Sequence, residues 1–346
     1  MSERRLFLDV CAGEQRAVVL LDGRPERLLI RRDGEAGDLL LGARHRARVR
    51  RVEPALGSAF LELGGGAEAM MDFRPDARPV QGQALEVEIR SEPRAGKLAL
   101  VRPLGEAAGP PALLAPPPDL AEQLQALVPS AFVETGREAR AAADEAEAEA
   151  LETVFALEGG GSLAIEPTRA LTAVDVDVGA RQGHGAKQVA RQANLTALRE
   201  AARLLRLKGL GGLVVVDLAG RGHDGTALLG AARAAFAPDN PGVAMGPIGK
   251  FGTLELVIPR RARPVVEQLC GADGRPTART LAQRLVRMAE REAAADPGAQ
   301  FELGCGEAVG REAGPLVAAL TARIGARASL AVDPGAPGDR LDVRRR

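Results

Sequence analysis

The sequence is poor in the aromatic side chains from which many binding surfaces are built. Its 346 residues include no Trp, no Tyr and only 8 Phe. This scarcity argues against a binding surface made mainly of aromatic rings and leaves few platforms on which nucleobases can stack. The chain therefore offers few aromatic side chains for base stacking.

Cysteine is also scarce, with only Cys11, Cys270 and Cys305, which lie far apart and form no CxxC pair. This argues against a disulfide framework or a zinc ribbon and favours a reducing compartment. No run reaches the roughly 18 apolar residues that a membrane helix needs. The N-terminal residues MSERRLFLDV lead into a strand-like run rather than a signal peptide. We therefore expect a cytoplasmic protein with no membrane partner.

Neither sign of charge is in excess, because 46 Lys and Arg residues balance 46 Asp and Glu residues. A net charge of zero argues against polyanion binding through bulk electrostatics, so any nucleic-acid site must be a local basic patch. The alternating residues Arg44, Arg46, Arg48 and Arg50 place four guanidinium groups on one face of a strand. Such a stripe either follows a phosphate backbone or is an ordinary solvated face of a sheet.

The first third of the chain predicts short strands. Residues 4–32 read as strands with a hairpin at Asp22-Gly23, and strand-sized segments continue to about residue 103, a pattern typical of a small barrel. The residues 105–119 are rich in Pro, Ala and Gly, and we predict a linker there.

A crossover α/β unit is predicted farther along the chain. Strand-like residues 163–178 precede an amphipathic helix for which Asn194 is the predicted N-cap. The apolar run at residues 213–216 then indicates a buried strand. From residue 277 onward helices alternate with strands, which favours a small α+β domain.

Two aspartates follow the apolar runs of this unit, Asp175 after Leu-Thr-Ala-Val and Asp217 after Leu-Val-Val-Val. Sites in α/β sheets form at the carboxyl ends of strands, so the two could hold one Mg²⁺ ion if their strands are neighbours. Aspartate after a strand is also a common turn or helix-cap residue. Asp177 should share the face of Asp175, where it either joins the site or faces solvent. His184 and His223, in glycine-rich loops nearby, either assist phosphate binding or are simply exposed.

These segments resemble the catalytic core of the ribonuclease E/G family. That family carries an EALTAIDVNSG-type strand, an NLEAAxEIARQLRLRDLGG-type helix and an IVIDF-type strand. This chain has ALTAVDVDVG, ANLTALREAARLLRLKGLGG and LVVVDL, and the separation of Asp175 from Asp217 is close to that of the family. GSAFLELGGGAEA resembles the family's S1-type OB-fold module, FGTLELVIPRR resembles its FGLLEMSRQR strand, and the tail from Thr277 resembles its small C-terminal domain.

The resemblance implies a multidomain fold of mixed α+β and α/β type. Residues 1–35 together with 104–168 would form a reduced RNase H-like subdomain. Residues 36–103 would form an inserted S1-type OB-fold barrel that binds RNA. Residues 169–276 would form a DNase I-like α/β catalytic core, and residues 277–346 a small α+β C-terminal domain.

The resemblance also implies a Mg²⁺-dependent endoribonuclease that cleaves single-stranded RNA in RNA processing or decay. Asp175 and Asp217 would hold Mg²⁺, or Mn²⁺ in its place, and a metal-activated water would leave 5′-phosphate and 3′-hydroxyl ends. Asp177, which the two-residue period of a strand places on the face of Asp175, is a further candidate catalytic residue. Phe60 matches an aromatic RNA-contact position, although it reads equally well as a core residue of the barrel. The other RNA-binding residues would be Lys97, Arg94, Arg44, Arg46, Arg48, Lys187 and Arg191.

The chain also departs from the family pattern. Asp177 stands where the family has Asn, and an ionised Asp cannot donate a hydrogen bond. The second aromatic of the barrel is replaced near Met70. Glu267 breaks the family's zinc-binding CPxC ahead of Cys270, so we expect neither a structural zinc nor a zinc-linked dimer. These departures favour an alternative, a catalytically weak or inactive RNA-binding protein that keeps the fold.

Overall fold

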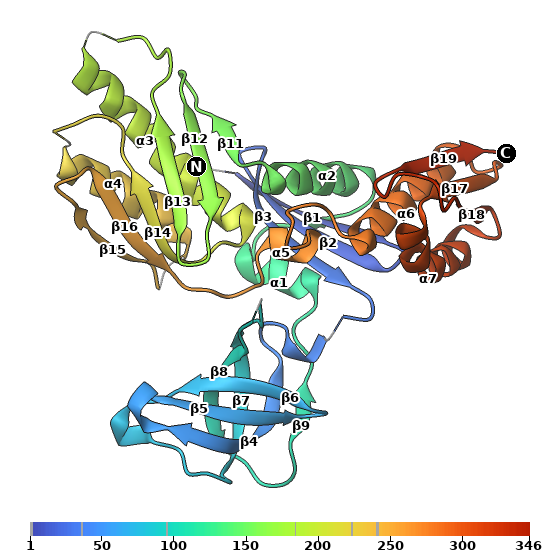
Figure 1. Cartoon of the computed structure of the whole chain (residues 1–346), viewed down its shortest axis with the longest axis horizontal. Helices are drawn as coiled ribbons and strands as arrows, with labels where there is room; N and C mark the ends of the chain where they lie inside the picture. The colour runs from blue at the N-terminus through green and yellow to red at the C-terminus, as the bar shows by residue number, and fades with distance from the viewer. Residues whose placement is uncertain (1–2, 36, 95, 184, 223, 240–241) are drawn as a thin grey trace.

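A computed structural model describes the protein at residues 3–35, 37–94, 96–183, 185–222, 224–239 and 242–346. Within these residues the fold consists of four β-sheets and the helices that pack on them (Figure 1). His184 and His223, the two suggested phosphate contacts, lie outside the described residues. Of the helices in the described part of the chain, none has both the length and the apolar character needed to cross a bilayer.

The central sheet has a helix on each face. Its elements are β10 (Val133–Glu134), β1 (Arg4–Cys11), β2 (Glu14–Leu21) and β3 (Arg24–Arg32), in that spatial order, with helices α1 (Leu120–Leu127) and α2 (Arg137–Leu151). The predicted hairpin is confirmed, because Asp22 and Gly23 have φ of 50° and 80°, as a type I′ turn requires. Alternate side chains of β2 point to opposite faces, so Val18 packs with α2 and Val19 with α1.

A closed five-stranded barrel lies below the central sheet in Figure 1. Its strands are β4 (Arg44–Glu53), β5 (Ser58–Gly64), β6 (Ala67–Asp72), β7 (Ala84–Ser91) and β8 (Ala99–Glu106). They pair in the order β4-β5-β6-β8-β7, and β7 pairs with β4 to close the barrel. Alternate residues such as Val49, Leu61 and Val87 fill the interior, as the two-residue period of a strand requires.

The segment predicted to be a linker, residues 105–119, is partly strand. β8 extends to Glu106, and β9 (Ala112–Ala115) pairs with β4. Between them, Arg48 donates a hydrogen bond to the carbonyl oxygen of Gly109. The prediction was wrong here because Pro- and Gly-rich composition indicates irregular structure, whereas contacts with β4 hold this segment against the barrel.

Among the described residues, the helices on the six-stranded sheet all lie on one face. Its strands, in spatial order, are β11 (Val154–Ala156), β12 (Ser162–Pro167), β13 (Thr172–Asp177), β14 (Gly212–Asp217), β16 (Thr253–Ile258) and β15 (Ala244–Ile248). The helices α3 (Ala186–Lys208) and α4 (Gly225–Phe236) pack on it, whereas the short α5 (Val265–Leu269) contacts α2, α3 and β3. α3 and α4 cover the face formed by Val174, Val176 and Val216 (Figure 1). The alternate residues face away from them. The predicted crossover unit of β13, α3 and the parallel strand β14 is confirmed.

Helix α3 begins at Ala186, so the prediction that Asn194 caps it was wrong. The residues before Asn194 continue the amphipathic pattern, since Ala190 and Ala193 are both buried. Asn is common at helix caps, but here its amide makes a tertiary contact described below. Arg191, which was expected to precede the cap, consequently lies inside the helix.

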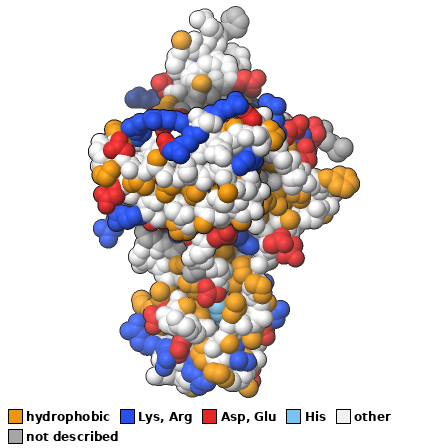
Figure 2. All heavy atoms as spheres, turned by 90° about the vertical axis from the view of Figure 1, so that its right-hand side faces the viewer, with side chains coloured by type: hydrophobic (Ala, Val, Ile, Leu, Met, Phe, Trp, Pro, Cys, Tyr) orange, Lys and Arg blue, Asp and Glu red, His pale blue; other side chains and the backbone are white. Residues whose placement is uncertain are grey.

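The C-terminal lobe lies on the side of the central sheet opposite the six-stranded sheet (Figure 1). Its elements are α6 (Ala278–Ala295), β17 (Phe301–Cys305), α7 (Glu307–Ile324), β18 (Ala328–Val332) and β19 (Leu341–Arg345). Figure 2 looks onto this lobe, where acidic and basic side chains both occur; Arg345, for example, pairs with Asp296 at 2.7 Å. The mixed α+β fold with a barrel is confirmed, whereas the RNase H-like and DNase I-like assignments stay predictions.

A buried ionic network joins the central sheet, α2 and α6. Arg16 of β2 has a side chain that is 0% exposed, and it contacts the carboxylates of Asp9 at 2.6 Å and Glu147 at 3.1 Å. Glu147 on α2 also accepts a hydrogen bond from Arg287 of α6 at 2.8 Å. Burial alone would raise the pKa of Glu147, but Arg287 and Arg16 outweigh it and hold this pKa below its ordinary value. Charges buried this deeply need such partners, because an unpaired one is costly to desolvate.

Candidate active site

Asp175 and Asp217 stand side by side at the carboxyl ends of two parallel strands. The register of β13 and β14 places Asp175 directly beside Asp217. Neighbouring strands lie about 4.8 Å apart, and side chains at paired positions point to the same face. That face is the one left uncovered by α3 and α4, and both residues are exposed. The two aspartates found from the sequence are therefore neighbours in space.

The two carboxylates fit a divalent cation such as Mg²⁺. Within the part of the chain that the structure describes, neither side chain has a hydrogen-bond or ion-pair partner. The described residues also contain no cluster of three or more His, Cys, Asp or Glu side chains that could bind a metal. Mg²⁺ is commonly held by one or two carboxylates, with waters and substrate phosphates as its other ligands. Two neighbouring carboxylates that have no partner among the described residues, on an open sheet face, suit that mode of binding.

Asp177 lies on the same face, two residues beyond Asp175. It is exposed, and its Oδ1 accepts a hydrogen bond from the backbone N–H of Gly179 at 2.9 Å. Its register neighbour is Ser162 on β12, on the side of β13 away from Asp217. At least one oxygen of Asp177 therefore stabilises the turn that follows β13.

Asn194 anchors the backbone that follows Asp217. Its Nδ2 donates a hydrogen bond to the carbonyl oxygen of Ala219 at 3.0 Å, and its Oδ1 accepts one from the N–H of Ala219 at 2.9 Å. Asn194 is 0% exposed, so its amide is committed to this one position. Ala219 is two residues from Asp217, and the contact therefore fixes the segment that carries the carboxylate. The sequence singled out Asn194 but assigned it the wrong role.

Two predicted phosphate-binding residues lie on α3. Lys187 is exposed in the first turn of the helix. Arg191 lies about one turn later, with its Nε 3.7 Å from the carboxylate of Asp224. Asp224 also caps α4, because its side chain accepts a hydrogen bond from the N–H of Ala227 at 3.1 Å. Arg191 thus shares an acidic neighbour with the start of α4.

Known proteins resemble the part of the chain that holds these residues. Residues 134–261 match the ribonuclease E/G family. Ribonuclease E of Escherichia coli K12 is 37% identical over 103 residues, which cover 29% of this chain and 10% of that protein. Ribonuclease E of Haemophilus influenzae is 37% identical over 107 residues, 29% of this chain and 11% of that protein. Ribonuclease G of Salmonella typhimurium is 30% identical over 139 residues, 38% of this chain and 28% of that protein.

The chain therefore aligns with only a minor part of these ribonucleases E and G, between 10% and 28% of their length. The segment that matches the ribonuclease E/G family includes Asp175, Asp217 and Asn194, along with all six strands of the open-faced sheet. The barrel and the C-terminal lobe lie outside it.

In the barrel, Phe60 lies on β5 outside the residues that fill the interior. Its ring is half-buried, and the guanidinium carbon of Arg51 lies 4.4 Å from the ring centroid. Met70 on β6, near the place where the ribonuclease E/G family has a second aromatic, pairs directly with Phe60. Phe60 therefore presents its ring on the wall of the barrel, stacked against an arginine.

Along β4, Arg44, Arg46 and Arg48 alternate with buried residues, as the sequence indicated. The alternation ends at Arg50, because the register with β5 shifts between Val49 and Arg51 and leaves both Arg50 and Arg51 exposed. Arg44 forms an ion pair with Glu86. Arg46 and Arg48 donate hydrogen bonds to the backbone carbonyls of Pro110 and Gly109. Part of the charge and hydrogen-bonding capacity of this stripe is thus used within the chain.

The loop between β7 and β8 carries Arg94 and Lys97, whose backbones hydrogen-bond to each other at 2.8 and 3.2 Å. The same loop joins the barrel to the segment after β16 through Glu92. The N–H of Glu92 donates to the carbonyl oxygen of Arg261 at 2.8 Å, and its carboxylate accepts from the N–H of Arg263 at 2.9 Å. Arg94 and Lys97 therefore sit beside the contact that attaches the barrel.

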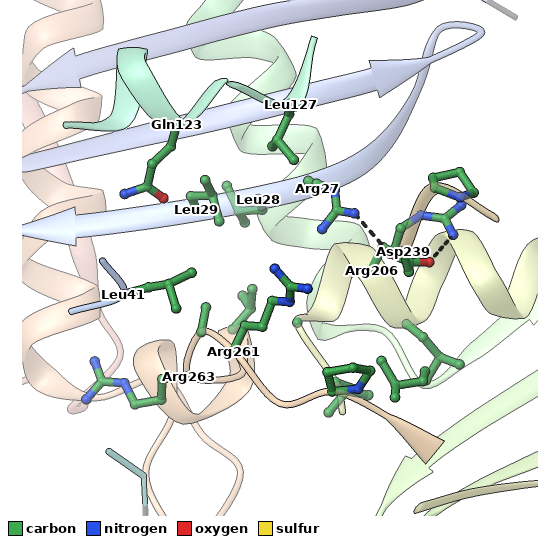
Figure 3. Close-up of a pocket in the computed structure, with 18 of the residues that line it drawn as sticks. Arg27, Leu28, Leu29, Leu41, Gln123, Leu127, Arg206, Asp239, Arg261 and Arg263 are labelled. Atoms are coloured by element: carbon green, nitrogen blue, oxygen red, sulfur yellow. Dashed lines mark hydrogen bonds and ion pairs between the residues drawn. The ribbon is translucent and has the colours of Figure 1, made fainter. Parts of the chain in front are cut away.

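A cavity of about 340 Å³ lies between β3, α1, the end of α3 and the segment after β16 (Figure 3). Arg27 and Arg206 both bond to Asp239, at 3.0 and 2.8 Å. Figure 3 shows Arg261 directed toward Arg27 across the cavity. Sequence reasoning missed this cavity because its walls come from segments far apart in the chain.

Proposed function

We propose that the protein is a Mg²⁺-dependent endoribonuclease that cleaves single-stranded RNA in cytoplasmic RNA processing or decay, leaving 5′-phosphate and 3′-hydroxyl ends. The observation that carries this proposal is the register that sets Asp175 beside Asp217 on an open sheet face. Both residues lie in the segment that matches the ribonuclease E/G family. The relatives named Ribonuclease E and Ribonuclease G support RNA as the substrate.

Asp175 and Asp217 would hold the metal ion, with waters and RNA phosphate oxygens as its remaining ligands. Bound Mg²⁺ supplies an activated water and neutralises charge on the phosphate. The two carboxylates are well placed for this because they project from adjacent, hydrogen-bonded strands, and Asn194 restrains the backbone after Asp217. An ionised Asp177 can only accept hydrogen bonds, so it would orient a water rather than a phosphate oxygen.

The barrel would bind the RNA outside the cleavage site. Its strand order fits the five-stranded barrels that bind oligonucleotides. Phe60 would stack on a base, while Arg94, Lys97 and the outward-facing arginines of β4 would contact phosphates. Lys187 and Arg191 would contact phosphates near the aspartates.

The test is cleavage of a 5′-labelled, unstructured RNA with Mg²⁺ and with EDTA. We expect Mg²⁺-dependent cleavage by the wild type, and a loss of about 100-fold or more in Asp175→Asn and in Asp217→Asn, because several kcal/mol of charge stabilisation depend on the metal. Glu255→Gln is the matched control, since Glu255 is an exposed carboxylate on the same sheet face, opposite Val215. Full activity in either Asn variant would contradict the proposed site.

The second candidate is a non-catalytic RNA-binding protein, which Asp177 favours because it replaces a hydrogen-bond donor of the family by an acceptor. It predicts salt-sensitive RNA binding without cleavage at any Mg²⁺ concentration. In that case, recovery of cleavage in Asp177→Asn would show that this one side chain suppresses the activity.

A further inference from the structure

The loop between β15 and β16 carries an exposed aromatic ring. It consists of Gly249, Lys250, Phe251 and Gly252. Phe251 is 83% exposed, and the Nζ of Lys250 lies 4.8 Å from the centroid of its ring. The chain has only 8 aromatic residues, and the ring of this one lies outside the core.

This loop is attached to the strand that carries Asp217. The N–H of Leu218, the next residue, donates a hydrogen bond to the carbonyl oxygen of Gly252 at 3.1 Å. Thr253, the first residue of β16, is the register partner of Asp217. Phe251 is two residues from Thr253, so their Cα atoms lie within about 7.6 Å of each other. The loop that carries Phe251 is therefore anchored beside the strand end that carries Asp217.

The loop is also held in one conformation. Gly252 donates from its N–H to the carbonyl oxygen of Gly249 at 3.0 Å, and Gly249 donates to the carbonyl oxygen of Thr253 at 2.8 Å. Gly252 is buried with a φ of 89°, a conformation that favours glycine. The backbone thus presents Phe251 and Lys250 from a fixed tight turn.

We propose that Phe251 is a stacking platform for the base of the nucleotide next to the scissile phosphate, with Lys250 beside it for the adjoining backbone phosphate. This inference rests on the proposed function. Proteins that bind single-stranded nucleic acid combine an aromatic ring with nearby cations, as this loop does. A protein partner would need a larger apolar patch, whereas the loop neighbours of Phe251 are two glycines and a lysine. Phe251 would therefore position the substrate for cleavage.

The test combines Phe251→Ala with RNAs in which one abasic nucleotide is moved along the strand. Binding is measured by fluorescence anisotropy in EDTA, and cleavage with Mg²⁺. We expect Phe251→Ala to weaken both by about 5- to 150-fold and Phe251→Trp to restore them. At one position, the abasic nucleotide should weaken RNA binding by the wild type as much as Phe251→Ala does. The same abasic RNA should not weaken binding by Phe251→Ala any further. Phe132→Ala is the matched control, because Phe132 is 91% exposed but precedes β10 in the central sheet.

Three results would overturn this proposal: no effect of Phe251→Ala on binding and cleavage, an equal effect of Phe132→Ala, or abasic losses that are unchanged in Phe251→Ala. A change of oligomeric state in Phe251→Ala without a change in RNA binding would assign the ring to a protein contact instead. If the wild type binds RNA through Phe251 but never cleaves it, the nuclease function and the placement next to a scissile phosphate fail, while base stacking on Phe251 stands. If the wild type neither binds nor cleaves RNA, both proposals fail.

Discussion

At the residue scale, Asn194 binds both backbone groups of Ala219, two residues after Asp217. Asn194→Ala would leave the N–H and C=O of Ala219 without these partners, so we expect the free energy of unfolding to fall by about 1–3 kcal/mol. The segment that carries Asp217 also loses its anchor, and RNA cleavage by the folded protein should fall by about tenfold or more. Denaturant unfolding and cleavage rates at saturating Mg²⁺ measure the two effects separately.

Gln283 provides the matched control for this variant. It is also a buried amide, and its Nε2 donates a hydrogen bond to the carbonyl oxygen of Gly13 at 2.9 Å, where α6 meets the central sheet. Gln283→Ala should lose comparable stability and keep the cleavage rate. Equal losses of cleavage in both variants would mean that Asn194 acts through stability alone.

At the scale of elements, Lys208 at the end of α3 binds the carboxyl end of α2. Its Nζ donates hydrogen bonds to the carbonyl oxygens of Ala150, at 2.8 Å, and Glu152. Burial nevertheless lowers the pKa of Lys208 from 10.5 to about 8. As the pH rises through this range, the folded state releases the proton while the unfolded state keeps it. The free energy of unfolding should therefore rise with pH, by up to about 3 kcal/mol.

Comparison with Lys208→Met isolates this effect. Burial also raises the pKa of the three thiols, Cys11, Cys270 and Cys305, so they too can make stability depend on pH in alkali. Both proteins contain these thiols, so their contribution cancels in the difference between the two free energies of unfolding. Denaturant unfolding between pH 8 and 10.5 should show the wild type gaining stability relative to Lys208→Met. A difference that does not change with pH would mean that Lys208 is not desolvated in the folded protein.

The same elements show which parts of the fold the sequence could predict. Local signals were sufficient for the hairpin at Asp22-Gly23 and for the buried strand at 213–216. They failed where a tertiary contact overrides a local preference. Asn194 has the residue type of a helix cap but binds a neighbouring strand end, and β9 lies in a Pro-rich stretch that pairing with β4 makes regular.

The candidate site was predictable to a similar extent. Apolar runs marked the strand ends, so Asp175 and Asp217 could be named from the sequence. The register that sets them side by side, and the sheet face that α3 and α4 leave open, could not be predicted, because they depend on tertiary pairing and packing. Phe251 was missed because a sequence does not show which phenylalanines stay outside the core.

At the scale of the whole molecule, Glu147 helps to hold the C-terminal lobe on the central sheet. Its carboxylate contacts Arg16 of β2 at 3.1 Å, and Arg284 and Arg287 of α6 at 2.8 Å each. Glu147→Gln would remove the negative charge that these three guanidinium groups share, of which those of Arg16 and Arg287 are buried. We expect the free energy of unfolding at neutral pH, measured with denaturant, to fall by about 3–5 kcal/mol.

The acid dependence of this contribution has a definite sign. Because the pKa of Glu147 in the folded protein lies below the ordinary 4.5, its stabilisation is present above that pH and is lost as the pH falls through the folded value. The stability difference between the wild type and Glu147→Gln should therefore shrink from neutral pH to about pH 3. Glu138→Gln is the control on the same helix: Glu138 is 72% exposed and pairs with Arg5 at 3.0 Å, so its loss should cost less than about 1 kcal/mol. Equal losses in both variants, or a difference that persists in acid, would show that the lobe is held by other contacts.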